Sequence, residues 1–353
     1  MPSVITHDTF GRELFADLNA IIGQSEEEKQ AFLLGCQGPD VFFYGIVNPL
    51  TPQANAAARK LHRSRCTEFL CGLAMSVPQI VEKHQTFETY KPSAQDVARA
   101  YALGYLMHFQ LDSMVHPLVF SQTFAYCNAG VPGLDMSSQS EVHVEIECEL
   151  DELVLTVKRS QTISTFDPSI ETLQACDRVL NIVGAMYELA FAISHAEKLP
   201  QNCFRLSVKA YRQTLRWLYS VTGVKRQLIG NFETLFRQHS YLRAMIHKNV
   251  KITESIFDNH EHFAWRDPWV SDITHTDSFW DLYVRALHEG KRHIVTYSDL
   301  IDSLLNSKEQ AMSDTTFKQQ LREIYVSILE MTEHKNFYGC DERIANPKTG
   351  KPL

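Results

Sequence analysis

HFQLDSMVHP, residues 108–117, carries three side chains of the kind that bind metal ions. His108, Asp112 and His116 follow one another at intervals of four residues. Residues four apart on an α-helix lie on nearly the same face, so these side chains would share one quadrant of a helix. The stretch therefore predicts both a helix and one wall of a metal site.

The residues on either side extend this helix and set its limits. From Ser93 onward, apolar residues follow helical spacing. Gly104 falls in the same row as His108, and its missing side chain would let another helix or a substrate approach closely. Pro117 removes a backbone donor directly after His116, so we expect the helix to stop or bend there.

A second row of ligand side chains lies in HVEIE, at 143–147. His143 and Glu147 are one helical turn apart and could bind Zn²⁺ together through a ring nitrogen and a carboxylate oxygen. Ligand histidines usually donate their other ring N–H to a second group. Glu145 and Asp151 are candidates for that role because they are near in sequence.

Three more candidate ligands precede both rows. His7 lies near the start, Asp40 lies where a helix gives way to the Gly- and Pro-rich segment 38–52, and His62 belongs to a helix expected over 53–75. Either row alone is a weak signal, because charged rows on helices are usually solvated. Nitrogen and oxygen ligands on several helices together favour a zinc site.

Nearly every segment has helical periodicity, and almost none alternates as a strand does. The sequence therefore predicts an all-α fold, a multi-helix bundle. Beyond a break at 165–169, helices are expected over 169–197, 204–221, 223–252, 277–306 and 314–333. We expect a zinc-binding helical domain over 1–165, a helical continuation over 166–335 that could belong to the same body, and a polar tail over 336–353.

Composition limits the classes of function. The chain has 353 residues, of which 44% are hydrophobic, and this is enough for a buried core. A net charge of -8 with a pI near 6.0 argues against a general nucleic-acid-binding surface and against whole-surface attraction to anionic lipid. No apolar run approaches a membrane span and no secretion signal is evident, so we expect a cytoplasmic protein with reduced cysteines.

The motifs resemble those of a known family, the bacterial zinc-dependent phospholipase C proteins, and look most like an uncharacterised branch found in Firmicutes-type bacteria. The matching pieces, in order, are THDTF (6–10), GCQGPDVFFY (35–44), LHR (61–63), GYLMHFQLDSMVHP (104–117) and HVEIECELD (143–151). The resemblance covers about residues 1–155. It implies the all-helical fold that this family shares with single-strand-specific zinc nucleases.

The resemblance also implies a cluster of three zinc ions and assigns their ligands by position. One zinc would take Asp40, His62, His108 and Asp112, with Asp112 bridging to its neighbour; a second would take His116, His143 and Glu147; a third would take His7 and Asp112. The secreted enzymes complete the third site with an N-terminal Trp, whereas this chain begins Met-Pro. Either another backbone group substitutes, or only two zinc ions bind tightly.

The activity implied is hydrolysis of a phosphate-ester substrate, with phospholipid among the candidates. Zinc lowers the pKa of bound water to about 7, and the resulting hydroxide can attack a phosphodiester. By the same resemblance, Asp40 would act as the catalytic carboxylate that holds or deprotonates this water. Two alternatives stay open: a nuclease or phosphomonoesterase with the same metal cluster, and a non-catalytic interaction protein stabilised by its metal.

Overall fold

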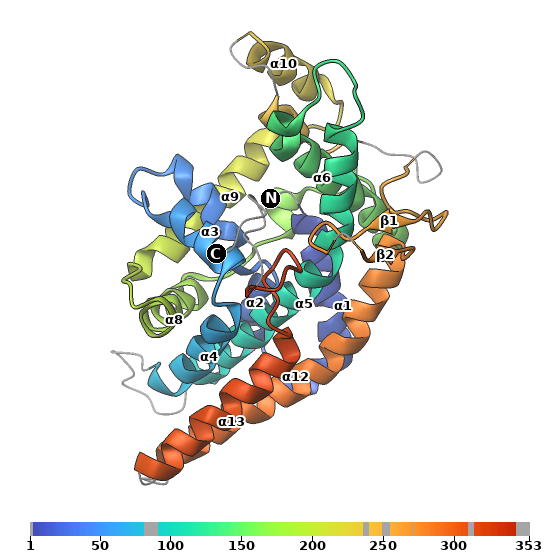
Figure 1. The fold of residues 1–353 in the computed structure, drawn as a ribbon. Coiled ribbons are helices and arrows are strands. Elements are labelled where there is room, and N and C mark those ends of the chain that lie inside the picture. The colour runs from blue at the N-terminus through green and yellow to red at the C-terminus, as the bar shows by residue number, and fades with distance from the viewer. Residues whose placement is uncertain are drawn as a thin grey trace. The chain divides into compact units, whose positions relative to one another are not determined.

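The structure is a computed structural model that describes residues 3–80, 91–235, 240–248, 255–270, 272–309 and 314–343. Regular structure in these residues is almost entirely helical (Figure 1), so the predicted all-α fold is confirmed. The α-helices are α1 (Val4–Ile22), α2 (Glu26–Gly35), α3 (Ala54–Arg63), α4 (Cys66–Ser76), α5 (Ala94–Cys127), α6 (Gln139–Arg159), α7 (Pro168–Glu171), α8 (Asp177–His195), α9 (Gln201–Leu218), α10 (Val224–Glu233), α11 (Tyr241–Ala244), α12 (Phe279–Glu309) and α13 (Asp314–Thr332). The 3-10 helices are η1 (Gly38–Val47), η2 (Val77–Gln79) and η3 (Met136–Ser138).

The chain divides into two compact units, each assembled from three separate stretches. Unit 1 consists of Met1–Thr9, Met114–Thr172 and Arg212–Arg285. Unit 2 consists of Phe10–Ser113, Leu173–Tyr211 and Ala286–Leu353. This division does not follow the boundary expected near residue 165, because later helices return to complete the unit that earlier helices begin.

Unit 2 has an aromatic core between α4, α5 and α8. Phe69, Tyr101 and Tyr187 are each no more than 1% exposed, and the Tyr101 hydroxyl donates to the Tyr187 hydroxyl at 2.8 Å. Helices α4 and α8 approach closely at Gly72, where a Cβ atom would lie 2.9 Å from the carbonyl oxygen of Ala190. The buried rings and this close approach make a rigid base for the helices that carry the candidate ligands.

Helices α2 and α5 touch through two glycines. A Cβ atom on Gly104 would collide with the carbonyl oxygen of Phe32, and one on Gly35 would collide with that of Tyr101. The expectation that Gly104 lets another element approach α5 is therefore confirmed, and that element is α2. Because α2 leads directly into η1, this crossing sets the position of the segment that contains Asp40.

Helix α5 does not end at Pro117, contrary to the expectation from sequence. It continues to Cys127 with Pro117 inside it. An interior proline costs roughly 3 kcal/mol. The residues beyond it, among them Leu118 and Val119, are buried, and burial of each large apolar side chain contributes about 1.5–3 kcal/mol, which offsets that cost.

Other element boundaries also differ from the expected ones. The helix expected over 53–75 is broken between α3 and α4, where Arg65 has a left-handed φ of 58°. Segment 38–52, expected to be a loop, begins with η1. The helix expected over 223–252 is represented by α10 and α11, and 249–252 lie outside the described residues.

Two short strands, β1 (Trp265–Arg266) and β2 (Thr274–His275), were not expected. They pair antiparallel, with Trp265 opposite His275. Strands of two residues are too short to show the alternation by which a strand is recognised in a sequence.

The end of the described chain is folded, which corrects the expected polar tail over 336–353. Phe337 is fully buried and Cys340 is 1% exposed. The carboxylate of Glu342 accepts hydrogen bonds from the amides of Arg65 and Cys66, at 2.9 Å each, and so satisfies donors at the start of α4. Residues 344–353 lie outside the described part.

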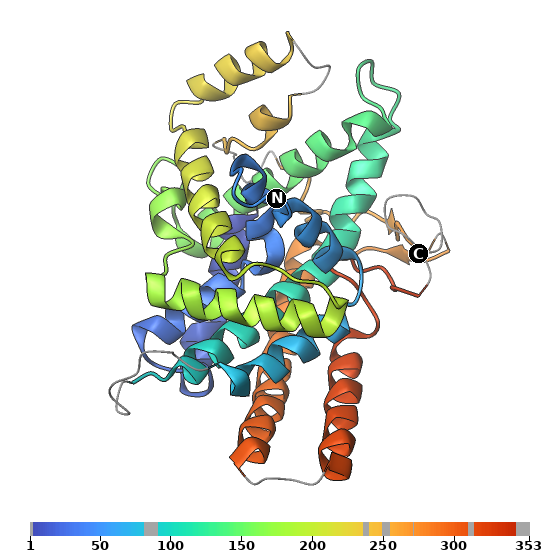
Figure 2. The ribbon, with the colours of Figure 1, turned by 90° about the vertical axis from the view of Figure 1, so that its left-hand side faces the viewer.

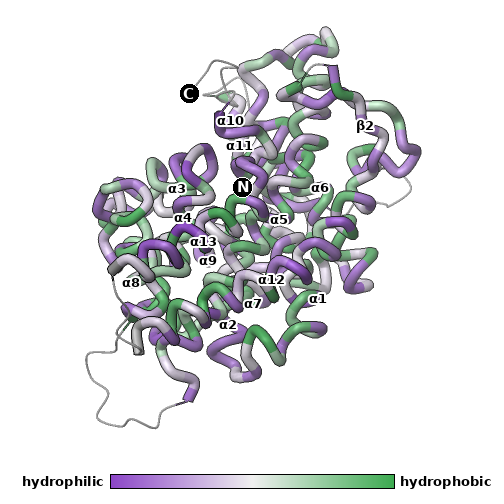
Figure 3. The backbone as a smooth tube through the Cα atoms, turned by 60° about the horizontal axis from the view of Figure 1, so that its bottom comes forward, coloured by the Kyte–Doolittle hydropathy of each residue, from purple (hydrophilic) through white to green (hydrophobic). Residues whose placement is uncertain are grey.

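Helices α12 and α13 lie side by side in both ribbon views (Figures 1 and 2). Gln320 of α13 donates to the carbonyl oxygen of Ser303 in α12 at 3.0 Å. Hydrophobic and hydrophilic residues alternate along the helices (Figure 3), as expected for helices with one buried face. Among the described residues, none of the helices has the length and apolar character that crossing a bilayer requires.

Candidate metal centre

Unit 2 brings together Asp40 from η1, His62 from α3 and His108 from α5. One ligand atom of each lies within 4.8 Å of the others, and the three side chains are at most 2% exposed. Nε2 of His62 is 2.8 Å from Oδ1 of Asp40, and Nε2 of His108 is 4.0 Å from the same oxygen. Asp112, one turn after His108, places Oδ2 at 3.4 Å from Nε2 of His108.

Both histidines of this group are oriented by backbone carbonyls. Nδ1 of His62 lies 2.7 Å from the oxygen of Ala58, and Nδ1 of His108 lies 3.0 Å from the oxygen of Cys36. A carbonyl oxygen can only accept, so each Nδ1 carries the ring hydrogen. Nε2 is therefore the ring atom that faces Asp40, and it is the atom that would bind a metal ion in place of a hydrogen.

Gly38 allows η1 to lie against His108. Its φ is +50°, and a Cβ atom there would collide with the imidazole of His108. Glycine adopts this left-handed conformation without a steric penalty. Because Asp40 is two residues further on, the glycine also fixes how close that carboxylate comes to the histidine.

The electrostatics of the group favour an ionised Asp40. Burial alone would raise the pKa of this carboxyl, but the hydrogen bond with His62 and the charge of His108 outweigh burial and hold the pKa well below its ordinary value. The buried carboxylate is therefore a permanent negative charge at neutral pH. A cation between it and the imidazole nitrogens would compensate this charge.

An aromatic wall formed by Phe337 and Tyr338 lies against this group, and sequence reasoning missed it. The ring centroid of Phe337 is 5.1 Å from that of His62 and 5.2 Å from that of His108. Tyr338 stacks on His62 at 6.2 Å, and burial raises its pKa to about 12 although the side-chain hydrogen bond with Arg63 opposes this. The aromatic pair in NFYGC was the available signal, but it lay in the supposed tail.

Unit 1 contains a second group, His116 from α5 with His143 and Glu147 from α6. Their ligand atoms also lie within 4.8 Å of one another. Oε1 of Glu147 is 3.3 Å from Nε2 of both His116 and His143, and the two imidazoles stack at 5.6 Å. Phe120 packs against His143 at 4.7 Å, and Trp269 packs against Phe120 at 5.1 Å, so this group also has an aromatic wall.

Glu147 has the properties of a cation ligand. Burial would raise its pKa, but the charges of His143 and His116 and their hydrogen bonds hold it well below its ordinary value. Its second oxygen, Oε2, is buried and makes no hydrogen bond among the described residues. A buried acceptor without a partner lowers the stability of the folded protein unless an ion or a hydrogen-bond donor binds it.

Comparison with known proteins agrees with this geometry. Residues 6–180 match the model of the zinc-dependent phospholipase C family. Residues 6–180 belong to the zinc-dependent phospholipase C family. No curated protein and no solved structure matches the chain.

The third zinc site that the phospholipase C family implies stays a prediction. His7 is buried near the start of α1 and belongs to unit 1, whereas His108 and Asp112 belong to unit 2. The role of Asp112 as a bridge between ions is likewise a prediction from the family.

Asp151 and Glu145, the expected partners of the ligand histidines, have other roles in this phospholipase C relative. Asp151 accepts hydrogen bonds from the backbone amides of Ile5 and Thr6, at 3.2 and 2.8 Å, and lies 3.1 Å from Nε2 of His247. It therefore binds amides at the start of the helix that carries His7. Glu145 accepts hydrogen bonds from both Arg226 and Lys248.

Residues with ligand chemistry outside these groups have their own partners. The candidate ligand groups among the described residues include no cysteine. His260 lies 2.8 Å from Asp258, and His262 lies 3.4 Å from Asp281; both rings are about half exposed. These pairs are small surface ion pairs and lack a third ligand among the described residues.

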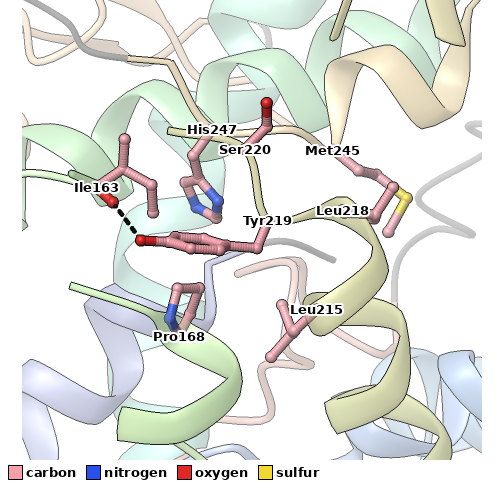
Figure 4. Close-up of a pocket in the computed structure, with 8 residues that line it drawn as sticks. All are labelled: Ile163, Pro168, Leu215, Leu218, Tyr219, Ser220, Met245 and His247. Carbon is pink, nitrogen blue, oxygen red and sulfur yellow. Dashed lines mark hydrogen bonds between the residues drawn. The ribbon is translucent and has the colours of Figure 1, made fainter. Parts of the chain in front are cut away.

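A small pocket in unit 1 is separate from the candidate ligands. It is lined by Ile163, Pro168, Leu215, Leu218, Tyr219, Ser220, Met245 and His247 (Figure 4). The Tyr219 hydroxyl donates to the carbonyl oxygen of Ile163 at 3.1 Å and closes one side. None of the lining residues belongs to a candidate ligand group, and the lining combines apolar side chains with those of Tyr219, Ser220 and His247.

Proposed function

We propose that this protein is a zinc-dependent hydrolase of phosphate esters, similar to a phospholipase C and acting on a phosphodiester. One observation carries the proposal: two groups of buried imidazole and carboxylate side chains occur in a chain of the zinc-dependent phospholipase C family. Family membership supports zinc as the ion, and the donor set of nitrogen and oxygen atoms is one that zinc accepts.

The residues fit the ion in three respects. Two of the histidines present Nε2 because backbone carbonyls hold Nδ1. The carboxylates of Asp40 and Glu147 are ionised while buried. Glu147 also has an oxygen without a hydrogen-bond partner among the described residues. These are the features of a site prepared for a divalent cation.

Bound zinc would supply a Lewis acid and a water molecule of lowered pKa. Asp40 would orient the attacking water by accepting a hydrogen bond from it, because this carboxylate stays ionised at neutral pH and lies near both His62 and His108. Arg63, hydrogen-bonded to Tyr338 beside this group, would attract a phosphate oxygen. The aromatic walls would exclude water from both groups.

The test compares zinc-loaded and chelated protein on three substrates: phosphatidylcholine, single-stranded DNA and a nucleotide monoester. We expect release of phosphocholine from phosphatidylcholine, loss of this activity with chelator, and recovery when zinc is returned. Cleavage of DNA or the monoester alone would replace the phospholipase assignment by a nuclease or phosphomonoesterase. If zinc is bound and all three substrates stay intact, the metal has a structural role and the hydrolase proposal is wrong.

A further inference from the structure

The end of α9, helix α10 and helix α11 form a basic part of an acidic protein. Residues 212–248 contain seven lysines and arginines and a single acidic residue, Glu233, whereas the whole chain has a net charge of -8. Glu233 is buried and accepts hydrogen bonds from the hydroxyl of Ser240 and the amides of Leu242 and Arg243. Arg226, Arg243 and Lys248 pair with Glu145, Glu141 and Glu149 of α6, and the cations at the exposed surface of the segment include Arg216 and Lys225.

Helix α10 exposes its apolar side. Val224, Leu228 and Phe232 are spaced by four residues and share one face of the helix, with exposures of 54%, 64% and 63%. Leu235, just beyond the helix, is 74% exposed. An amphipathic helix normally turns such a face to the protein core, so the orientation of α10 is the reverse of the usual one.

The opposite, polar face of α10 binds the protein. Arg226 donates to both carboxylate oxygens of Glu145 at 2.6 Å and to the carbonyl oxygens of Arg243 and Ile246 at 2.8 and 2.6 Å. Gly230 is buried, and a Cβ atom on it would lie 2.6 Å from Cδ of Arg243. These contacts hold the helix with its apolar residues outward.

Trp217 adds an interfacial side chain at the end of α9. Its neighbours Leu215 and Leu218 line the pocket of Figure 4, whereas Trp217 is 72% exposed. Lys225 donates to the carbonyl oxygens of Trp217 and Tyr219 and so joins the end of α9 to the start of α10. Tryptophan, leucine and basic residues together are the composition of helices that lie in the surface of a bilayer.

We propose that Trp217, Val224, Leu228, Phe232 and Leu235 form a docking face for a bilayer that contains anionic phospholipid. The apolar side chains would enter the lipid headgroup region, while Arg216 and Lys225 contact lipid phosphates. The proposal rests on the proposed function, because a hydrolase of phospholipid needs access to a bilayer. Charge complementarity favours anionic lipid over a neutral surface.

The docking face is mechanically tied to the unit-1 ligand group. Glu145, which binds Arg226 of α10 and Lys248, lies in α6 between His143 and Glu147. Helix α10 is therefore held, through the Arg226–Glu145 ion pair, to the helix that supplies two candidate ligands.

The test is flotation of the zinc-loaded protein with vesicles of phosphatidylcholine, with and without phosphatidylglycerol. We expect binding to the anionic vesicles, weakened by high salt, and a loss of at least about tenfold in the double variant Trp217→Ser, Leu228→Ser. The matched control is Val284→Ser with Val326→Ser, two apolar residues of similar exposure, 52% and 51%, on α12 and α13. A second pair compares Arg216→Glu with Lys318→Glu, and we expect only the first to weaken binding.

Hydrolysis of a soluble phosphodiester, measured on the same samples, separates this proposal from the proposed function. Equal flotation of the double variant and the wild type would overturn the docking face, as would absence of vesicle binding in a protein that hydrolyses the soluble ester. Self-association lost in the double variant, or binding of RNA in place of vesicles, would also overturn it. Vesicle binding without any hydrolysis would leave the docking face standing and refute the hydrolase.

Discussion

At the residue scale, spacing pointed to the ligand rows on α5 and α6, whereas Asp40 and His62 were assigned from their place in the chain and from the family resemblance. His108 with Asp112, and His143 with Glu147, are each one turn apart, and this periodicity is visible in the sequence. The carbonyl partners of His62 and His108 could not be predicted, because the position of a backbone oxygen depends on the path of the chain and not on residue type. Phe337 was missed because its contacts with His62 and His108 also depend on the path of the chain.

Replacing His108 by alanine should remove one equivalent of zinc. The variant loses the Nε2 that lies beside both Asp40 and Asp112, so the remaining side chains bind the ion too weakly to retain it. Metal analysis of the purified protein by mass spectrometry measures the loss. The control is His260→Ala, an exposed histidine outside the groups, and an unchanged zinc content in His108→Ala would refute the ligand assignment.

Glu152 gives the protein a pH-dependent stability. Burial raises its pKa to about 7, with Asp151 adding to the rise and His247 opposing it. The pKa of Glu152 is higher in the folded protein than its ordinary value of 4.5, so the protonated carboxyl contributes to the free energy of unfolding below that value. This contribution to stability is lost as the pH rises through about 7. Glu152→Gln, which cannot ionise, should therefore gain stability over the wild type at pH 8, on the order of 1–3 kcal/mol.

The measurement for Glu152 is urea unfolding of both proteins at pH 5 and pH 8 with equal zinc content. We expect the two curves to differ little at pH 5 and the variant to unfold at higher urea at pH 8. A difference that is the same at both pH values would show that Glu152 does not titrate in this range.

At the element scale, helices were predictable and their interruptions were not. The apolar periodicity of α5 extends through Pro117, and the packing of Leu118 and Val119 decided against a break there. The break between α3 and α4 depends on Arg65, an ordinary residue in a left-handed conformation that its type does not suggest. Local propensity was overridden by tertiary packing in the first case and gave no signal in the second.

The crossing of α2 and α5 should tolerate no side chain at Gly104. In Gly104→Ala the methyl group meets the backbone of α2 at Phe32, so the helices must separate, at a cost of roughly 1–3 kcal/mol. Thermal unfolding measures the loss, and zinc content should fall because α2 positions η1. Gly290→Ala is the control, since its methyl group meets only the flexible side chain of Met107. Equal stability of both variants would contradict the crossing.

At the scale of the whole molecule, residues far apart in sequence complete each unit. The wall of Phe337 and Tyr338 belongs to unit 2, as do His62 and His108, although about two thirds of the chain or more separates them in sequence. Such long-range contacts leave no periodic signal in the sequence. The sequence therefore indicated a division near residue 165, where the row of candidate ligands ends.

Removing residues 334–353 should expose the unit-2 ligand group and lower its zinc retention, while the His116, His143 and Glu147 group keeps its ion. The physical reason is loss of the aromatic wall and of the Glu342 contacts at the start of α4. Zinc content after dialysis is the measurement, and a chain that ends at residue 343 is the control. Full zinc retention in the shorter chain would show that the wall does not enclose the ion.

The same wall sets an order of events during translation. The ribosome makes Asp40, His62 and His108 long before it makes Phe337 and Tyr338, so the nascent protein offers these ligands to any divalent cation in its surroundings. Competition among metals in that interval would be governed by metal availability and intrinsic affinity rather than by enclosure. Packing of Phe337 and Tyr338 would then enclose whichever ion is bound, so the metal content of the protein should follow the metal supply during growth.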